Sequence, residues 1–173
     1  MWHQARSIRL LAMDVDGVLT DGRILLDSQG RELKGFHVHD GQGIVLAHRA
    51  GLQTAWVSGR SSEAVAQRAS ELGVSWLYQG IADKGRVLQE LLQQTTLSPD
   101  AIAYIGDDLG DLAIMRCVGL PIAVADARPE VRACAAWVTH QPGGHGAVRE
   151  VIDLVLRAQG RWAAVVQGSV HSV

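Results

Sequence analysis

The chain has 173 residues, 47% of them hydrophobic and 20% charged, with a formal net charge of -2. This composition is typical of one globular domain with a buried core, and the absence of a dense Lys/Arg run argues against a nucleic-acid or anionic-membrane surface. No apolar stretch reaches membrane-spanning length, and the two cysteines lack metal-site or disulfide spacing. We therefore expect a cytoplasmic protein that binds neither nucleic acid nor membrane.

Short apolar runs alternate with segments of helical periodicity along most of the chain. This alternation predicts an α/β fold, a mostly parallel central sheet with helices on both faces. In chain order, strands are expected at 8–13, 54–57, 74–78, 102–105, 122–124 and 137–139. Helices are expected at 43–50, 62–72, 84–94, 109–117, 129–133 and 147–158, with Gly51 and Gly73 at helix C-termini.

Residues 22–38 interrupt the alternation, because two extended runs flank the turn sequence DSQG. They predict a β-hairpin insertion. Its apolar side chains, Ile24, Leu25, Leu26 and Phe36, suit pairing between subunits, although a hairpin that folds back on its own sheet is the alternative. We expect one domain over 1–160 and a C-terminal tail over 161–173. The final AAVVQGSVHSV of this tail carries no charged side chain and is expected to be poorly ordered.

Two carboxylates, Asp14 and Asp16, follow the first expected strand within LLAMDVDGVLTDG. Charged groups at the edge of a core are costly unless a cation or hydrogen bonds compensate them, so the pair suggests a bound cation. A calcium-binding loop is the alternative interpretation. It would need an acidic or amide residue in place of Val18, Gly in place of Leu19 and Glu in place of Leu25, and these three residues are all apolar.

Other polar groups also lie just after expected strands: Ser58 after TAWV, Lys84 after SWLYQGIAD, and Asp107 and Asp108 after IAYIG. Ligands of open α/β sheets bind beyond the carboxyl ends of the strands, so four loops can converge on one spot. Taken singly, Ser58 would be a capping residue, Lys84 a solvated lysine, and DDLGD an acidic helix start. Their shared placement just after apolar strands favours one common site, and acidic, hydroxyl and ammonium groups together suit a phosphate group and its cation.

The Asp-x-Asp-Gly motif, Ser58, Lys84 and GDDLGD together resemble the haloacid dehalogenase superfamily of phosphotransferases. The resemblance implies that Asp14 is the nucleophile and Asp16 the general acid and base. It also implies Mg²⁺ held by Asp14, the Asp16 backbone carbonyl and Asp107, with Ser58 and Lys84 on the phosphoryl oxygens. Asp108 and Asp111 would support the metal loop and Lys84.

The spacing between these motifs leaves no room for a cap domain, so the site of a monomer would stand open. Bulk water weakens electrostatic catalysis, and either a phosphoprotein substrate or a neighbouring subunit must then close the site. The fold expected is therefore a capless, Rossmann-like member of the superfamily.

A closer resemblance, over about 8–158, is to the 3-deoxy-D-manno-octulosonate 8-phosphate phosphatase family. It rests on MDVDGVLTDG, FHVHDGQGI, VSGRSSEAVAQRASELGV, LYQGIADK, YIGDDLGDL and PGGHGAVREV. The family implies a homotetramer in lipopolysaccharide precursor synthesis, in which the hairpin of one subunit shapes the next cleft and a tail can reach a neighbouring site. It also implies that Ser58, Gly59, Arg60, Arg68 and Lys84 bind an acidic sugar phosphate.

Three positions depart from that family's pattern: His37, His39 and Gln42. On a strand, the two histidines would share a face, so they would form a metal pair or, in our preferred interpretation, line an intersubunit wall or bind substrate hydroxyls. The alternative functions are a phosphatase for a neuraminate-type or nononate-type sugar phosphate and a non-catalytic oligomerisation module of the same fold.

Overall fold

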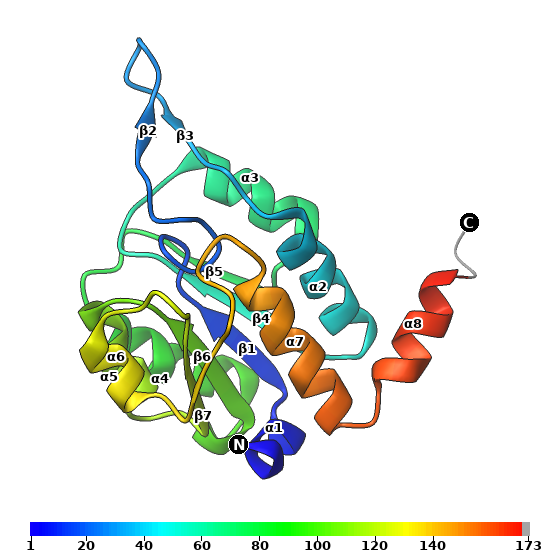
Figure 1. Ribbon diagram of the computed structural model, residues 1–173. Helices are drawn as coiled ribbons and strands as arrows, with labels where there is room; N and C mark the ends of the chain where they lie inside the picture. The colour runs from blue at the N-terminus through cyan, green and yellow to red at the C-terminus, as the bar shows by residue number, and fades with distance from the viewer. Residues whose placement is uncertain (171–173) are drawn as a thin grey trace.

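The computed structural model describes residues 1–170, and the side chains of 1–168. Its centre is a six-stranded sheet with the strand order β5-β4-β1-β6-β7-β8, in which every neighbouring pair is parallel (Figure 1). The predicted α/β fold and all six expected strands are confirmed. The strands are β1 (Leu10–Met13), β4 (Gln53–Val57), β5 (Trp76–Tyr78), β6 (Ile102–Gly106), β7 (Leu120–Ala123) and β8 (Trp137–Val138).

The middle strands β1 and β6 are buried at every residue. β1 pairs with both neighbours along its whole length, so Leu10 lies opposite Gln53 and Ile102, and Met13 opposite Trp56 and Ile105. Such unbroken apolar strands are typical of a parallel sheet covered on both faces. The parallel arrangement brings the chain out of β1, β4 and β6 at the same edge of the sheet.

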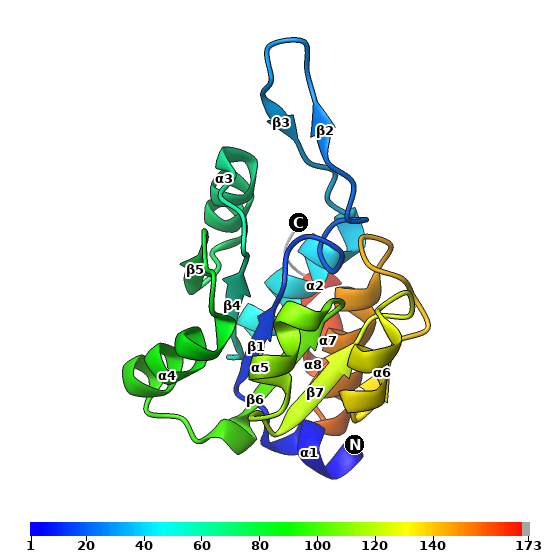
Figure 2. The same ribbon diagram turned by 90° about the vertical axis from the view of Figure 1, so that its left-hand side faces the viewer.

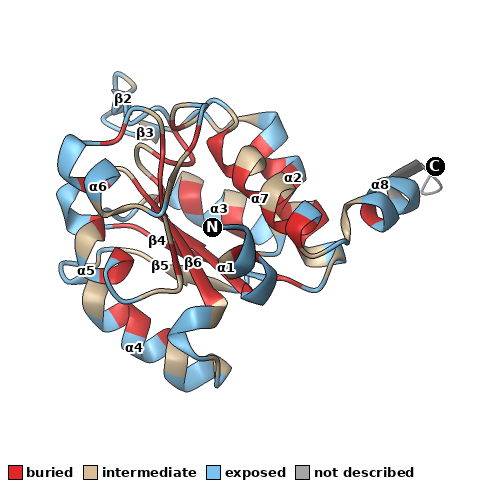
Figure 3. Ribbon diagram, turned by 60° about the horizontal axis from the view of Figure 1, so that its bottom comes forward, coloured by how far each residue is buried: buried red, intermediate tan, exposed pale blue. Residues whose placement is uncertain are grey.

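Helices cover both faces of the sheet, with apolar sides turned inward (Figure 3). On one face α2 contacts α7 and α3, and on the other α5 contacts α4 and α6. The bounds are α2 (Val38–Arg49), α3 (Glu63–Leu72), α4 (Lys84–Thr95), η1 (Pro99–Ala101), η2 (Leu109–Asp111), α5 (Leu112–Met115), α6 (Pro129–Cys134) and α7 (Ala147–Ala158). No helix within the described residues has the length and apolar character that crossing a membrane requires.

The helices differ from the predictions in four places. α2 begins at Val38 rather than at residue 43, and α1 (Trp2–Ser7) was not expected. The expected helix 109–117 is divided into η2 and α5. The prediction of a poorly ordered tail is wrong for α8 (Trp162–Val170), which is anchored where the Arg157 guanidinium stacks over Trp162 at 4.4 Å; residues 171–173 lie outside the described part.

The hairpin is present but short, with β2 (Leu25–Leu26) and β3 (Glu32–Leu33) forming a separate antiparallel sheet. Figures 1 and 2 show it projecting away from the central sheet, so the folded-back alternative does not occur. One apolar residue expected on its pairing surface is not available there. Phe36 stacks on Trp56 of the core, with ring centroids 6.1 Å apart.

Candidate active site

Side chains from three loops meet at the carboxyl edge of the sheet. Asp14 directly follows β1, Asp107 follows β6, and Lys84 is the first residue of α4. The Lys84 ammonium lies 2.9 Å from Asp14 Oδ1. Asp14 Oδ1 also accepts a hydrogen bond from the Val15 backbone at 2.7 Å, which fixes the carboxylate in place.

Asp111 is the buried centre of this arrangement. Its Oδ1 accepts hydrogen bonds from Lys84 at 2.7 Å and from the Tyr104 hydroxyl at 2.7 Å. Its Oδ2 accepts from the backbone N–H groups of Asp107 at 2.9 Å and Asp108 at 3.2 Å. Asp108 in turn caps η2. Through these contacts Asp111 supports the loop that follows β6 and orients Lys84.

Glycine is required at Gly17 by both conformation and space. Its φ is 92°, and a Cβ there would lie 2.1 Å from Asp107 Oδ2. A Cβ on Gly143 would lie 1.7 Å from the Gly17 carbonyl oxygen, so a third loop packs equally closely on the first. The glycine of the Asp-x-Asp-Gly motif thus allows the loops after β1 and β6 to touch.

The charges in this cluster are unbalanced. Burial, reinforced by the charge of Asp111, raises the pKa of Asp14 from 3.8 to about 6. Burial and the neighbouring Asp14 raise the pKa of Asp107 to about 8. Burial works to lower the pKa of Lys84, but Asp14 and Asp111 more than offset this effect and raise it. The single ammonium group of Lys84 therefore has to compensate three closely spaced carboxylates, and a further positive charge would stabilise their ionised forms.

The residues present fit a divalent cation. Oxygens of Asp14, Asp107 and Asp111 lie within 4.8 Å of one another, and Asp107 Oδ1 is buried without a hydrogen-bond partner in the described protein. Both oxygens of Asp111 are already engaged by four donors, which leaves Asp14 and Asp107 as the carboxylates able to bind the ion. Hard oxygen ligands of this kind suit Mg²⁺.

Asp16 lies beside this cluster and faces the hairpin. Its Oδ2 is 3.5 Å from Ser58 Oγ. Its Oδ1 accepts a hydrogen bond from Lys34, which directly follows β3 at the base of the hairpin. Ser58 is buried, and its Oγ accepts the backbone N–H of Arg60 at 3.1 Å across the exposed Gly59. Sequence reasoning missed Lys34, although a signal existed: it is one of only two lysines among 16 basic residues.

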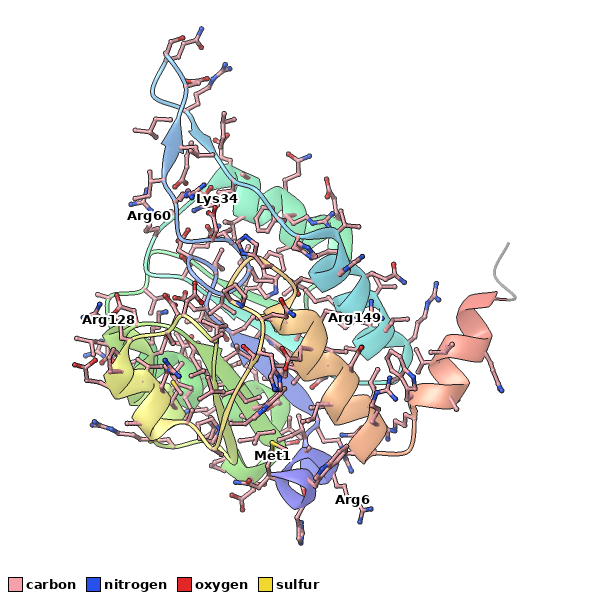
Figure 4. The ribbon with its side chains drawn as sticks, in the orientation of Figure 1. Met1, Arg6, Lys34, Arg60, Arg128 and Arg149 are labelled. Carbon is pink, nitrogen blue, oxygen red and sulfur yellow. The ribbon has the colours of Figure 1, made fainter. Side chains whose placement is uncertain are left out.

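The two arginines expected to bind substrate lie in different surroundings. Arg60 extends toward the hairpin, where its Nη2 lies 3.0 Å from Glu32 Oε1 (Figure 4). Arg68 pairs with Glu71 on its own helix, at 3.1 Å, and lies against α2, because a Cβ on Gly41 would be 2.4 Å from its Nη2. Both arginines therefore form ion pairs with glutamates rather than with the Asp14 cluster.

His37 and His39 do not lie on a strand, so that expectation is wrong. His37 is the N-cap residue of α2 and His39 is in its first turn, with the two rings edge to face at 5.0 Å. Both line a cavity of about 570 Å³ together with His140 and His145. Among the described residues, the one set of three candidate ligands within reach of a shared ion is Asp14, Asp107 and Asp111, which does not favour a histidine metal pair.

Asp40 is a buried carboxylate that sequence reasoning also missed. It accepts backbone hydrogen bonds from Gly146 at 3.2 Å and Arg149 at 2.7 Å, and so ties the start of α7 to α2. Burial raises its pKa. Its partners lie more than 100 positions away, which no local pattern can indicate.

Comparisons with known proteins agree with this geometry. Residues 77–152 match the haloacid dehalogenase-like hydrolase family model. The chain is 48% identical, over 91% of its length and 84% of the relative's, to 3-deoxy-D-manno-octulosonate 8-phosphate phosphatase KdsC of Salmonella typhi.

Solved structures give the same result. A probable YrbI family phosphatase from Pseudomonas syringae pv. phaseolica superposes with a TM-score of 0.96 at 43% identity, covering 99% of this chain and 98% of the other. The 3-deoxy-D-manno-octulosonate 8-phosphate phosphatase of Moraxella catarrhalis, solved with magnesium, phosphate and a KDO molecule, superposes with a TM-score of 0.94 at 42% identity over 97% of each chain. The chain belongs to the 3-deoxy-D-manno-octulosonate 8-phosphate phosphatase family of haloacid dehalogenase-like hydrolases.

Proposed function

We propose that this chain is a Mg²⁺-dependent phosphatase that hydrolyses 3-deoxy-D-manno-octulosonate 8-phosphate to the free sugar acid and inorganic phosphate, in lipopolysaccharide precursor synthesis. The observation that carries the proposal is the meeting of Asp14, Lys84 and Asp107 at one edge of the sheet, in a chain 48% identical to a phosphatase of that name. A phosphoryl-transfer site needs an in-line nucleophile and compensation of the phosphoryl charge, and this cluster supplies both.

The proposed reaction has two steps. The Asp14 carboxylate attacks phosphorus, and the bond from phosphorus to the sugar oxygen breaks while Asp16 gives that oxygen a proton. Water then attacks the aspartyl-phosphate, Asp16 takes a proton from it, and phosphate leaves with Asp14 regenerated. The position of Asp16 two residues after Asp14, with its carboxylate directed toward Ser58 and the hairpin, supports a place for it on the leaving-group side.

The remaining residues hold the phosphoryl group. Lys84 is fixed between Asp14 and Asp111 and would face the phosphoryl oxygens, as would the Ser58 hydroxyl. Asp14, Asp107 and the Asp16 carbonyl would hold Mg²⁺, which when bound neutralises charge on the phosphate and the carboxylates. Gly59, Arg60 and Arg68 are proposed to bind the acidic sugar, for which a guanidinium offers paired donors.

The proposed assembly is a cytoplasmic homotetramer in which the hairpin covers a neighbour's cleft. This proposal is supported by the apolar residues of the projecting hairpin. More than half of the surface is exposed in each of Ile24, Leu25, Leu26 and Leu33. Apolar side chains gathered on a projecting strand pair are typical of an interaction surface. Residues 1–160 would form the phosphatase domain, with the tail from 161 available to a neighbouring subunit.

A panel of phosphate esters, assayed with and without Mg²⁺, tests the function. We expect 3-deoxy-D-manno-octulosonate 8-phosphate to be hydrolysed faster than neuraminate-type and nononate-type 9-phosphates and faster than a generic ester. Equal rates with the generic ester would contradict the substrate assignment. Asp14→Asn should abolish turnover; comparable activity in that variant would contradict the nucleophile assignment, and no turnover of any ester by the wild type would favour a non-catalytic module.

A further inference from the structure

The two lysines of this chain are both buried beside catalytic carboxylates. The other basic residues are arginines, whereas Lys34 and Lys84 have side chains exposed by only 1% and 10%. Burying an ammonium group is costly unless anionic partners surround it. Lys84 already has a place in the proposed reaction, and Lys34 does not.

Lys34 connects the hairpin to Asp16. Its ammonium pairs with Asp16 Oδ1 and lies 3.2 Å from Glu32 Oε1, the same oxygen that Arg60 contacts at 3.0 Å. Figure 4 shows Lys34 and Arg60 close together at the foot of the hairpin. One continuous line of charges, Asp16, Lys34, Glu32 and Arg60, thus joins three loops.

This line of charges fixes the direction of the Asp16 carboxylate. Oδ1 is held by Lys34, and Oδ2 is directed to Ser58 Oγ at 3.5 Å. An aspartate with only one of these contacts could rotate about its side-chain bonds. General acid catalysis requires the donor within hydrogen-bond reach of the oxygen that departs, so a rotated Asp16 would lose its effect.

We propose that Lys34 is a positioning residue for the leaving-group step: its ammonium orients Asp16 toward the departing oxygen and so makes the reaction depend on where the hairpin lies. This inference rests on the proposed function, because it takes Asp16 as the proton donor. Lys34 acts through Asp16 and need not touch the substrate.

The alternative is that Lys34 only anchors the hairpin, and leaving-group dependence separates the two roles. The departing alkoxide of a sugar phosphate needs a proton, whereas 4-nitrophenolate leaves without one. Single-turnover rates of alcohol release are therefore measured for Lys34→Met with both esters. We expect a loss of about 100-fold for the sugar phosphate, in the range of general acid catalysis, and little change for 4-nitrophenyl phosphate.

Two further variants control the comparison. Lys34→Arg keeps the charge and should recover part of the loss with the sugar phosphate. If Lys34→Met unfolds, the two esters are compared with Lys34→Arg instead. Arg31→Gln removes a different hairpin cation, one paired with Asp27 and 73% exposed, and should leave both rates unchanged. Thermal melting verifies that each variant is folded.

Equal losses of Lys34→Met with both esters, or no loss with either, would overturn the proposal. A failed substrate assignment gives a different result: wild-type protein would then hydrolyse 3-deoxy-D-manno-octulosonate 8-phosphate no faster than glycerol 3-phosphate. In that case the same leaving-group comparison is made with glycerol 3-phosphate, whose alkoxide also needs a proton.

Discussion

The Tyr104 hydroxyl donates a hydrogen bond to Asp111 Oδ1 at 2.7 Å, and the same oxygen pairs with Lys84. Tyr104 is fully buried in β6. From this strand its hydroxyl holds Asp111, the residue that supports the loop after β6. Burial and the neighbouring charge of Asp111 raise its pKa well above the ordinary value, which keeps the hydroxyl as a donor.

Tyr104→Phe should therefore destabilise the protein and reduce turnover. Loss of a buried hydrogen bond to a charged acceptor costs about 1 to 3 kcal/mol, measured as the free energy of unfolding in urea. Tyr78→Phe is the matched control, since the Tyr78 hydroxyl makes one longer bond, 3.5 Å to Gln94. Equal stability of the two variants would contradict the supporting role given to Tyr104.

The thermal stability of the metal-free protein should fall as pH rises. Asp14 and Asp107 have folded-state pKa values of about 6 and about 8, above the ordinary 3.8, so the folded protein retains protons that the unfolded chain releases. Their contribution is fully present below about pH 4 and is lost as pH rises through 6 and then 8. Mg²⁺ should consequently raise the Tm more above pH 8 than at pH 6.

Thermal melts in a chelator and in excess Mg²⁺ at several pH values measure this difference. Asp107→Asn is the control, because removing one carboxylate should flatten the pH dependence in the chelator and reduce the Mg²⁺ effect. A magnesium effect on Tm that is the same at all pH values would contradict the assignment of the cation to these carboxylates.

Gly17→Ala should damage the site more than a glycine substitution elsewhere with the same backbone conformation. At Gly17 the new methyl group would collide with Asp107 Oδ2, in addition to the strain of φ 92°. Gly30 has φ 78° but no atom within 4 Å of its Cβ position, so Gly30→Ala adds the strain alone. We expect Gly17→Ala to lose about 2 kcal/mol or more of stability and most of the affinity for Mg²⁺.

Urea unfolding and magnesium titration of both variants provide the comparison. Gly30→Ala should lose about 1 kcal/mol and bind Mg²⁺ like the wild type. Unchanged magnesium affinity in Gly17→Ala would mean that Asp107 moves aside without consequence for the ion.

Leu26→Glu should weaken the proposed assembly without unfolding the subunit. Leu26 is 63% exposed on the hairpin, so a charge there costs little in the isolated chain but much at an apolar interface. Light scattering should give a larger mass for the wild type than for the variant, whose cleft would be open and less active. Ser28→Glu, at the hairpin turn, is the control, and a monomeric wild type would contradict the assembly.

The sheet and the meeting of the acidic motifs could be predicted because both depend on local features. Apolar runs define the strands, and a side chain directly after a parallel strand has its position fixed by the backbone. These two features were sufficient to predict the positions of Asp14 and Asp107.

The parts that were missed depend on distant contacts. α2 starts earlier than expected because Gly41 and Gly43, poor helix formers, are buried there, and a Cβ on Gly43 would lie 3.0 Å from the Arg149 side chain of α7. Close helix packing outweighed intrinsic propensity. The pairing of Lys34 with Asp16 depends likewise on the path of the hairpin, which residue spacing does not specify.

The scarcity of lysine in this chain has a practical consequence for chemical labelling. Both side-chain amines lie in ion pairs beneath loops of the site, with 1% and 10% of their side chains accessible. An amine-directed reagent should therefore modify Lys34 only when the hairpin lifts, and the time course of its acylation, followed by mass spectrometry, would report how often that hairpin opens.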